Sequence, residues 1–327
     1  MTGKGGSKVA VIAAVVGNLV VAIIKFIAAS ITGSSAMISE GIHSLVDTGN
    51  GGLVLLGLKA SGAPADDDHQ FGHGKELYFW TLIVAISIFG MGGGMSVYEG
   101  ITHIQHPSPL ENPMVNYIVL GISLLVEGAS FLIAMREFAH AKGHKSAWEF
   151  VRTAKDPSLF TVVFEDSAAM LGLLVAFFGV FLGHLLENPY FDGAASIVIG
   201  LILMTVAWGL ARESKGLLIG EGAEPELLAR LRSSVESDPD VKAVGAIRTM
   251  YLGPDDLLVN VDVAFRRTLR TEGVNRTIDR IESGLKAQDP AIKRVYIELD
   301  SVKDLVGAGP AARPDPAAAA TGEAADH

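Results

Sequence analysis

The sequence predicts an α-helical membrane protein with six transmembrane helices, followed by a cytoplasmic α+β domain. The first supporting observation is composition, because 49% of the 327 residues are hydrophobic and only 19% are charged, whereas soluble domains are about a quarter charged. The second is a change after Lys215, where long apolar stretches give way to short amphipathic segments. We therefore expect a transmembrane domain at 1–212, a cytoplasmic domain at 213–304 and a disordered tail at 305–327.

The transmembrane helices are predicted from length. A helix needs roughly 20 apolar residues to cross about 30 Å of hydrocarbon. Six stretches approach this length: 8–30, 36–58, 77–99, 113–135, 159–183 and 191–211. The first is not interpreted as a signal peptide, because no small-residue cleavage site ends it and the hydrophobic pattern continues into further spans.

Lysine and arginine in the loops predict the orientation. The loops at 31–35, 104–112 and 184–190 contain neither residue, whereas the connection at 136–155 contains five. Because short cytoplasmic loops are enriched in these residues, we expect both termini to be cytoplasmic.

The segment after the last span predicts a compact two-layer, ferredoxin-like domain. A helical pattern at 226–235 precedes two β-like runs at 241–251 and 257–265, joined by the turn sequence at 253–256. A second helix at 270–287 and a strand at 294–299 complete an α-β-β-α-β order.

Two features of the composition exclude classes of function. The chain has no cysteine, which excludes disulfides, thiolate metal sites and a cysteine nucleophile, so that metal chemistry must use His, Asp and Glu. The formal net charge is −10, which argues against nucleic acid as a partner.

Ionisable residues inside the spans are the strongest functional signal, because each costs at least about 2.5 kcal/mol at the membrane centre. The second span contains Glu40, His43 and Asp47. On a helical wheel Glu40 and Asp47 lie about 20° apart, and His43 and Asp47 about 40° apart. An imidazole and a carboxylate one turn apart are suitably spaced to bind one divalent ion.

Acids in two further spans fall at a similar depth. Glu127 lies in the fourth span, and Glu165 and Asp166 in the fifth. With about 1.5 Å per residue, Asp47 is expected roughly 14 Å from the cytoplasmic edge, and Asp166 and Glu127 roughly 10 Å from it. Burying five acids with one lysine leaves a charge deficit that a cation would fill.

Structural interpretations compete with this one. A single histidine in an apolar helix is more often a packing residue, and a protonated Glu127 could bond to a neighbouring helix. Lys25 in the first span either pairs with these acids or snorkels to the membrane surface. Glycines 90 and 92–94 favour a close helix-packing surface over a ligand loop.

Two motifs carry a family resemblance. Residues 39–47, SEGIHSLVD, and residues 69–76, HQFGHGKE, resemble the cation diffusion facilitator family of divalent-metal transporters, as does the layout of the whole chain apart from its tail. The resemblance implies a homodimer that exports Zn²⁺ or related ions from the cytoplasm in exchange for protons. It also implies a metal site shared between spans two and five.

Residues of this chain match the family's metal-ligand positions at all but one position. His43 and Asp47 match the span-two ligands, but the span-five pattern His-x-x-x-Asp falls on Val162 and Asp166. Residues 165–169, EDSAA, instead resemble the zinc-transporter-nine-like, mitochondrial-exporter branch. Glu165 or Glu127 is then a candidate for the missing ligand, and Glu40 joins them as a further candidate for the transmembrane metal site, beside His43, Asp47 and Asp166. A carboxylate-rich site accommodates Mn²⁺ more readily.

A second metal site is expected in the cytoplasmic loop between spans two and three. Asp66, His69 and His73 match the positions of a secondary site in some family members, while the alternative is a solvated acidic loop. From Gly220 to Asp326 the chain contains no histidine. We therefore expect no high-affinity zinc sensor in the cytoplasmic domain. The role that we expect for this domain is dimerisation.

The leading prediction is thus a proton-coupled exporter of Zn²⁺, with Mn²⁺, Co²⁺ and Fe²⁺ as alternative substrates, and neither an enzyme nor a holder of a prosthetic group. We expect a multi-pass protein in a prokaryotic cytoplasmic membrane, with metal, protons, lipid and a second copy of the chain as partners. Two alternatives are a metal-binding membrane scaffold that does not transport, and an intramembrane metal-dependent enzyme with Glu165 as base.

Overall fold

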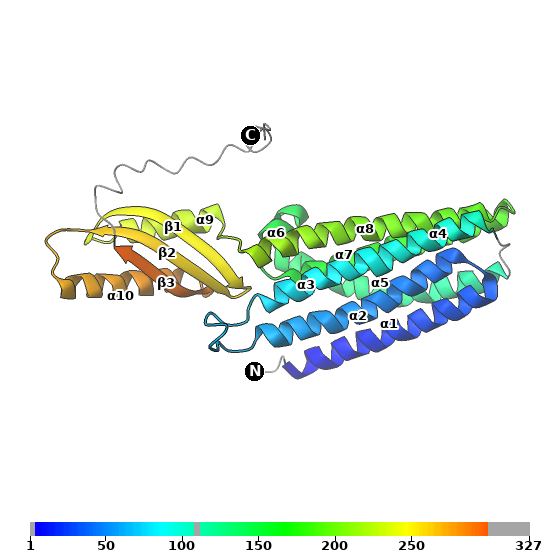
Figure 1. The fold of residues 1–327 in the computed structure, drawn as a ribbon, viewed down its shortest axis with the longest axis horizontal. Helices are drawn as coiled ribbons and strands as arrows, with labels where there is room; N and C mark the ends of the chain where they lie inside the picture. Colours follow the sequence, from blue (N-terminus) through cyan, green and yellow to red (C-terminus); the bar gives the residue numbers. More distant parts are fainter. Residues whose placement is uncertain (1–3, 108–111, 300–327) are drawn as a thin grey trace, which may run out of the picture. The chain divides into compact units, whose positions relative to one another are not determined.

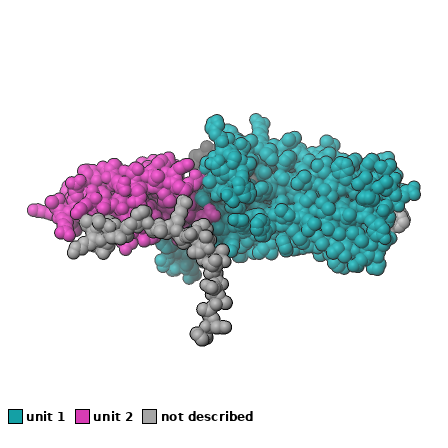
Figure 2. All heavy atoms as spheres, turned by 90° about the horizontal axis from the view of Figure 1, so that it is seen from above, with its two compact units in different colours: residues 1–220 teal, residues 221–327 magenta. Residues whose placement is uncertain are grey.

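A computed structural model describes residues 4–107 and 112–299. The chain divides into two compact units, residues 1–220 and 221–327, coloured teal and magenta in Figure 2. The first unit is helical, and the second contains the sheet (Figure 1).

Within the described residues of the first unit, six long helical rods run side by side (Figure 1). One rod is composite, because α3, the π-helical turn η1 and α4 follow one another with helical dihedral angles at both junctions. The elements are α1 (Lys4–Thr32), α2 (Ser35–Ser61), α3 (Glu76–Ser87), η1 (Ile88–Gly94), α4 (Met95–Gln105), α5 (Pro113–Lys142), α6 (Ala147–Thr153), α7 (Pro157–Leu185) and α8 (Tyr190–Ile219).

Four helical segments among the described residues are long and apolar enough to cross a membrane: Glu76–Gln105, Pro113–Lys142, Phe160–Leu185 and Tyr190–Ile219. In α1 the described apolar part, Gly17–Thr32, is shorter. The 27-residue α2 is not among the four, and it is the helix that carries the acidic and imidazole side chains. The predicted fold class, a multi-helix membrane unit followed by a small α+β domain, is confirmed.

The glycines of η1 and α4 pack against α8. A Cβ added to Gly93 would lie 2.9 Å from the carbonyl oxygen of Gly200, and one added to Gly100 would lie 2.6 Å from that of Gly193. Such distances are too short for non-bonded atoms, so only glycine permits this approach of two backbones. Of the predicted packing surface at glycines 90 and 92–94, Gly93 makes this backbone approach, whereas a Cβ added to Gly90 would meet no atom within 4 Å.

The helix α2 contacts α1, α3, α4, α7 and α8 within the first unit, and its buried residues include Glu40, His43 and Asn50. Large apolar side chains on the outer helices are exposed, including Leu125 and Leu132 of α5 at 76% and 68%, as expected of surfaces that face lipid. The polar face of α2 is therefore enclosed by other helices.

The second unit is a three-stranded sheet with two helices. Its elements are α9 (Pro225–Glu236), β1 (Val241–Gly253), β2 (Asp256–Phe265), α10 (Thr271–Gln288) and β3 (Ile292–Leu299). The strand order is β1-β2-β3, with β1 and β2 antiparallel and β2 and β3 parallel. This is the α-β-β-α-β order that the sequence predicts.

The hairpin turn lies at the predicted residues 253–256. Gly253 pairs with Asp256 in the ladder, so only Pro254 and Asp255 form the turn. The core joins Leu231 and Val235 of α9 to Leu285 of α10 and to the buried side chains of β2. The predicted disordered tail at 305–327 lies outside the described residues.

Candidate functional site

The helix α2 is anchored at its N-terminus by an acid from another helix. Asp192, in the first turn of α8, accepts hydrogen bonds from the hydroxyl of Ser34 at 2.7 Å and from the backbone amide of Ser35 at 2.5 Å. The hydroxyl of Ser34 also caps α2 by accepting from the amide of Met37. Capping bonds fix the start of a helix, and here they fix the helix that carries the predicted metal ligands.

His43 and Asp47 form the centre of the candidate site. His43 Nδ1 lies 3.4 Å from Asp47 Oδ1, and their side chains are 2% and 16% exposed. Within the described part of the chain, both ring nitrogens of His43 and Oδ1 of Asp47 have no hydrogen-bond partner. Buried polar atoms are rarely left unpaired, so these three atoms are available to a ligand.

Two acids of α7 lie near Asp47, and each is held by a polar residue of another helix. Asn50 of α2 donates a hydrogen bond to Glu165 Oε1 at 2.9 Å. Ser130 of α5 donates one to Asp166 Oδ2 at 3.3 Å. Both acids are close enough to Asp47 to interact with it electrostatically.

Neither Asn50 nor Ser130 is among the residues predicted from the sequence. Asn50 follows Asp47 by three positions, which places the two residues on one face of α2, so the helical spacing could have indicated it. Nothing local in the sequence singles out Ser130, because its role depends on how α5 packs against α7.

Glu40 and Glu127 lie against a lysine. The ammonium of Lys25 is 3.0 Å from Glu40 Oε2 and 2.7 Å from Glu127 Oε1, and it also donates to the hydroxyl of Ser44 at 2.9 Å. Lys25 is fully buried. Of the two alternatives for this residue, pairing with the acids is therefore correct and snorkelling is wrong.

The loop between α2 and α3 gathers three predicted ligands. Asp66 Oδ1 lies 3.3 Å from His69 Nδ1, and Asp66 Oδ2 lies 3.0 Å from His73 Nε2. Hydrogen bonds from the His73 ring and the His69 amide lower the pKa of the Asp66 carboxyl below its usual value. Gly72, at φ +82°, adopts the left-handed conformation that lets the chain turn between the two histidines.

The two groups of predicted ligands differ in how closely they converge. Within the described part of the chain, Asp66, His69 and His73 are the one group of three or more His, Asp or Glu residues whose ligand atoms all lie within 4.8 Å of one another. The intramembrane set around His43 and Asp47 is more widely spaced. Its assignment as the metal site stays a prediction.

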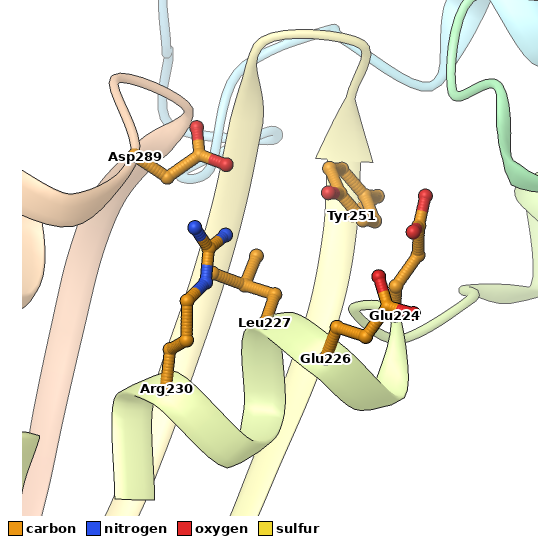
Figure 3. A pocket seen from close by; sticks show the side chains of 6 residues that line it. All are labelled: Glu224, Glu226, Leu227, Arg230, Tyr251 and Asp289. Carbon is orange, nitrogen blue, oxygen red and sulfur yellow. The ribbon is translucent and has the colours of Figure 1, made fainter. Parts of the chain in front are cut away.

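A pocket of about 370 Å³ lies in the second unit (Figure 3). In the figure the guanidinium of Arg230 points toward Asp289, and Tyr251 lies beside Glu224. Because a fixed positive charge lies among its acids, this pocket does not define a cation site. Its lining residues are Glu224, Glu226, Leu227, Arg230, Tyr251 and Asp289.

Comparison with known proteins identifies the class. Residues 11–219 match the model of the cation efflux transmembrane domain. The chain therefore belongs to the cation efflux family, and the predicted family resemblance is confirmed.

Individual relatives define the branch. The chain is 36% identical to the proton-coupled zinc antiporter SLC30A9, mitochondrial, of Homo sapiens, over 90% of this chain and 59% of the relative. It is 28% identical to Metal tolerance protein C4 of Arabidopsis thaliana, over 76% of this chain and 55% of the relative. The similarity supports the predicted zinc-transporter-nine-like branch. The chain spans less than two thirds of the length of both relatives.

Proposed function

We propose that this protein exports a divalent cation, Zn²⁺ in the first instance, from the cytoplasm in exchange for protons. The observation that carries the proposal is the buried His43–Asp47 pair of α2, whose ring nitrogens and carboxylate oxygen have no hydrogen-bond partner among the described residues. Such atoms in a protein of the cation efflux family are suited to bind a metal ion. The similarity to a proton-coupled zinc antiporter favours zinc and protons as the exchanged ions.

We assign four ligands to the transported ion: His43 and Asp47 from α2, and Glu165 and Asp166 from α7. Glu165 is preferred to Glu127 as the replacement for the span-five histidine, because Glu127 is engaged by Lys25. Three carboxylates and one imidazole form an oxygen-rich donor set, which also accommodates Mn²⁺.

Proton coupling follows from competition for these ligands. A metal ion binds the neutral imidazole and the ionised carboxylates, so its binding releases any protons they carry. Protons arriving from the opposite side of the membrane would in turn displace the metal. One set of residues can therefore couple the two fluxes without a separate proton site.

The remaining parts receive supporting roles. The Asp66, His69 and His73 loop collects metal at the cytoplasmic entrance, and the second unit pairs two copies of the chain. Both termini face the cytoplasm, and the membrane is the cytoplasmic membrane of a prokaryote. The proposed domain limits stay 1–212, 213–304 and 305–327, which assign the last residues of α8 to the cytoplasmic domain, whereas the compact units meet between residues 220 and 221.

Transport by the purified chain in sealed vesicles tests the proposal. With an imposed pH gradient, Zn²⁺ should accumulate and protons should move in the opposite direction, and Asp47→Ala should abolish both fluxes. Glu137→Gln, which neutralises an exposed acid of α5, is the matched control and should leave both fluxes unchanged. If Asp47→Ala transports normally, the assigned site is wrong. Binding without accumulation by the unmodified chain would instead indicate a metal-binding scaffold.

A further inference from the structure

The Lys25 ammonium occupies a position built like a cation site. Its three N–H donors meet three oxygens, from Glu40, Ser44 and Glu127, at 2.7 to 3.0 Å. An ammonium has three donors, so this lysine is saturated. The oxygens come from α2 and α5, whereas the lysine reaches them from α1.

Each of the two carboxylates around Lys25 has an oxygen that is not used in a hydrogen bond. Oε1 of Glu40 and Oε2 of Glu127 are buried and have no hydrogen-bond partner among the described residues. Glu40 Oε1 points at α7, where a side chain on Gly172 would collide with it. Two carboxylates carry two negative charges, of which one ammonium neutralises only one. A divalent ion would neutralise both and would use the free oxygens.

This position adjoins the proposed metal site. On α2, Glu40 and Ser44 are one turn apart, as are His43 and Asp47, and the two pairs lie on neighbouring strips of the helix. With the N-terminus of α2 at the outer face, Glu40 is about 10 Å further outward than Asp47. Glu40 and Ser44, and the lysine that they contact, therefore lie outward of Asp47 along α2.

We propose that Glu40, Ser44 and Glu127 form a second intramembrane cation site, which the Lys25 ammonium fills as a tethered ion and which a divalent cation occupies when the ammonium is removed. For transport, this inference rests on the proposed export function. The tethered charge keeps the exported ion from settling on the outward side of Asp47, so the ion is released rather than retained. Lys25 acts here as a fixed positive charge, and the proposal does not require it to lose a proton.

Counting bound Mn²⁺ tests the site without any transport measurement. The full chain carrying Asp66→Asn, His69→Gln and His73→Gln, which disable the loop cluster, serves as the parent in a buffer with choline as the monovalent cation. Electron paramagnetic resonance counts bound Mn²⁺ per chain. Adding Lys25→Met should raise the count by one. Lys25→Arg, which retains the charge, should leave it at the parental value.

The triple change Lys25→Met, Glu40→Gln and Glu127→Gln tests whether the extra ion binds to these carboxylates or results from general disruption of the structure. It should return the Mn²⁺ count to the parental value, because the carboxylates that bind the extra ion are gone. An unchanged count in Lys25→Met, or an extra ion that persists in the triple variant, would overturn the proposal.

Folding needs its own readout, because removing one partner from a buried ion pair is strongly destabilising. If Lys25→Met is aggregated in metal-free buffer, millimolar Mn²⁺ should restore its monodisperse fraction in size-exclusion chromatography, while the triple variant should show no such dependence. Absence of rescue counts against the site. In vesicles, Lys25→Met should retain metal and turn over at least tenfold more slowly. Should no form of the chain transport, the export function fails while the Mn²⁺ count still decides the second site.

Discussion

The buried acids of α2 and α7 and the exposed loop between α2 and α3 offer the same kinds of ligand in opposite arrangements. In the loop, Asp66, His69 and His73 have already converged, with side chains that are 17% to 58% exposed. In the helices, the histidine and acids are enclosed and more widely spaced.

The difference follows from the surroundings of the charges. Water screens the loop residues, and Asp66 accepts hydrogen bonds from its histidine neighbours. Inside the helical unit, acids that approach one another repel strongly because screening is weak. They are instead held by Asn50, Ser130 and Lys25. A buried site of this kind is expected to contract when a divalent ion replaces the missing positive charge.

The largest effect should follow from removing a buried ligand. Asp166→Asn is expected to lower zinc flux in vesicles at least 100-fold, because an amide cannot supply the negative charge that offsets the ion. The exposed-acid control Glu137→Gln should retain normal flux. Normal flux in Asp166→Asn would remove Asp166 from the site.

Residues that hold the ligands should matter less than the ligands themselves. Asn50→Ala frees Glu165, and we expect a roughly tenfold loss of metal affinity, in the range known for residues that orient metal ligands. Thr48→Val is the matched control, because the Thr48 hydroxyl bonds only to the backbone of its own helix at Ser44 among the described contacts. Isothermal titration with Zn²⁺ measures the affinity of each variant. An affinity of Asn50→Ala equal to that of Thr48→Val would show that Asn50 has no part in the site.

Removing the ligands of the loop between α2 and α3 should weaken the capture of zinc and leave the turnover rate largely unchanged. The combination Asp66→Asn, His69→Gln and His73→Gln is expected to raise KM for zinc about three- to tenfold, with kcat altered less than twofold, since the ligands deeper in the protein are intact. Asp67→Asn with Asp68→Asn serves as control, because it removes two negative charges from the same loop, whereas Asp66→Asn removes one. A loss of kcat in the first variant would place the loop within the transport cycle itself.

The smallest effect should come from an exposed ion pair without a ligand role. Arg280 donates to Asp238 at 2.6 Å and lowers the pKa of that carboxyl below its usual value. A pKa that is lower in the folded state stabilises the fold above the unfolded pKa of about 3.9, and this contribution disappears as the pH falls through the folded value. Arg280→Met should therefore lower the free energy of unfolding slightly at pH 7.

Hydrogen exchange of the α10 amides in the full chain measures this cost. The ratio of the exchange rates in the variant and in the unmodified chain should approach one as the pH falls below the lowered pKa of the Asp238 carboxyl. Arg276→Met, on the same helix, should change the exchange rates little at any pH. A ratio independent of pH would mean that Arg280 acts through packing rather than charge.

The sequence by itself determined the kind of protein and most of its elements. Apolar length predicts the membrane helices, and period and turn residues predict the α-β-β-α-β order, because these signals are local. The spacing of His43 and Asp47 predicts one group of metal ligands, and the family resemblance together with the local cluster predicts Asp66, His69 and His73 as another. Each group is close in space because its members are close in sequence on one helix or loop.

The tertiary structure decided which acids are free and which are engaged. Lys25 is 15 positions from Glu40 and 102 from Glu127, and Asn50 is 115 from Glu165, so no local pattern pairs them. The same applies to Asp192, which caps α2 from α8 across 157 positions. Helix packing makes these contacts, and in a medium without water a buried charge must find its partner wherever the neighbouring helix presents one.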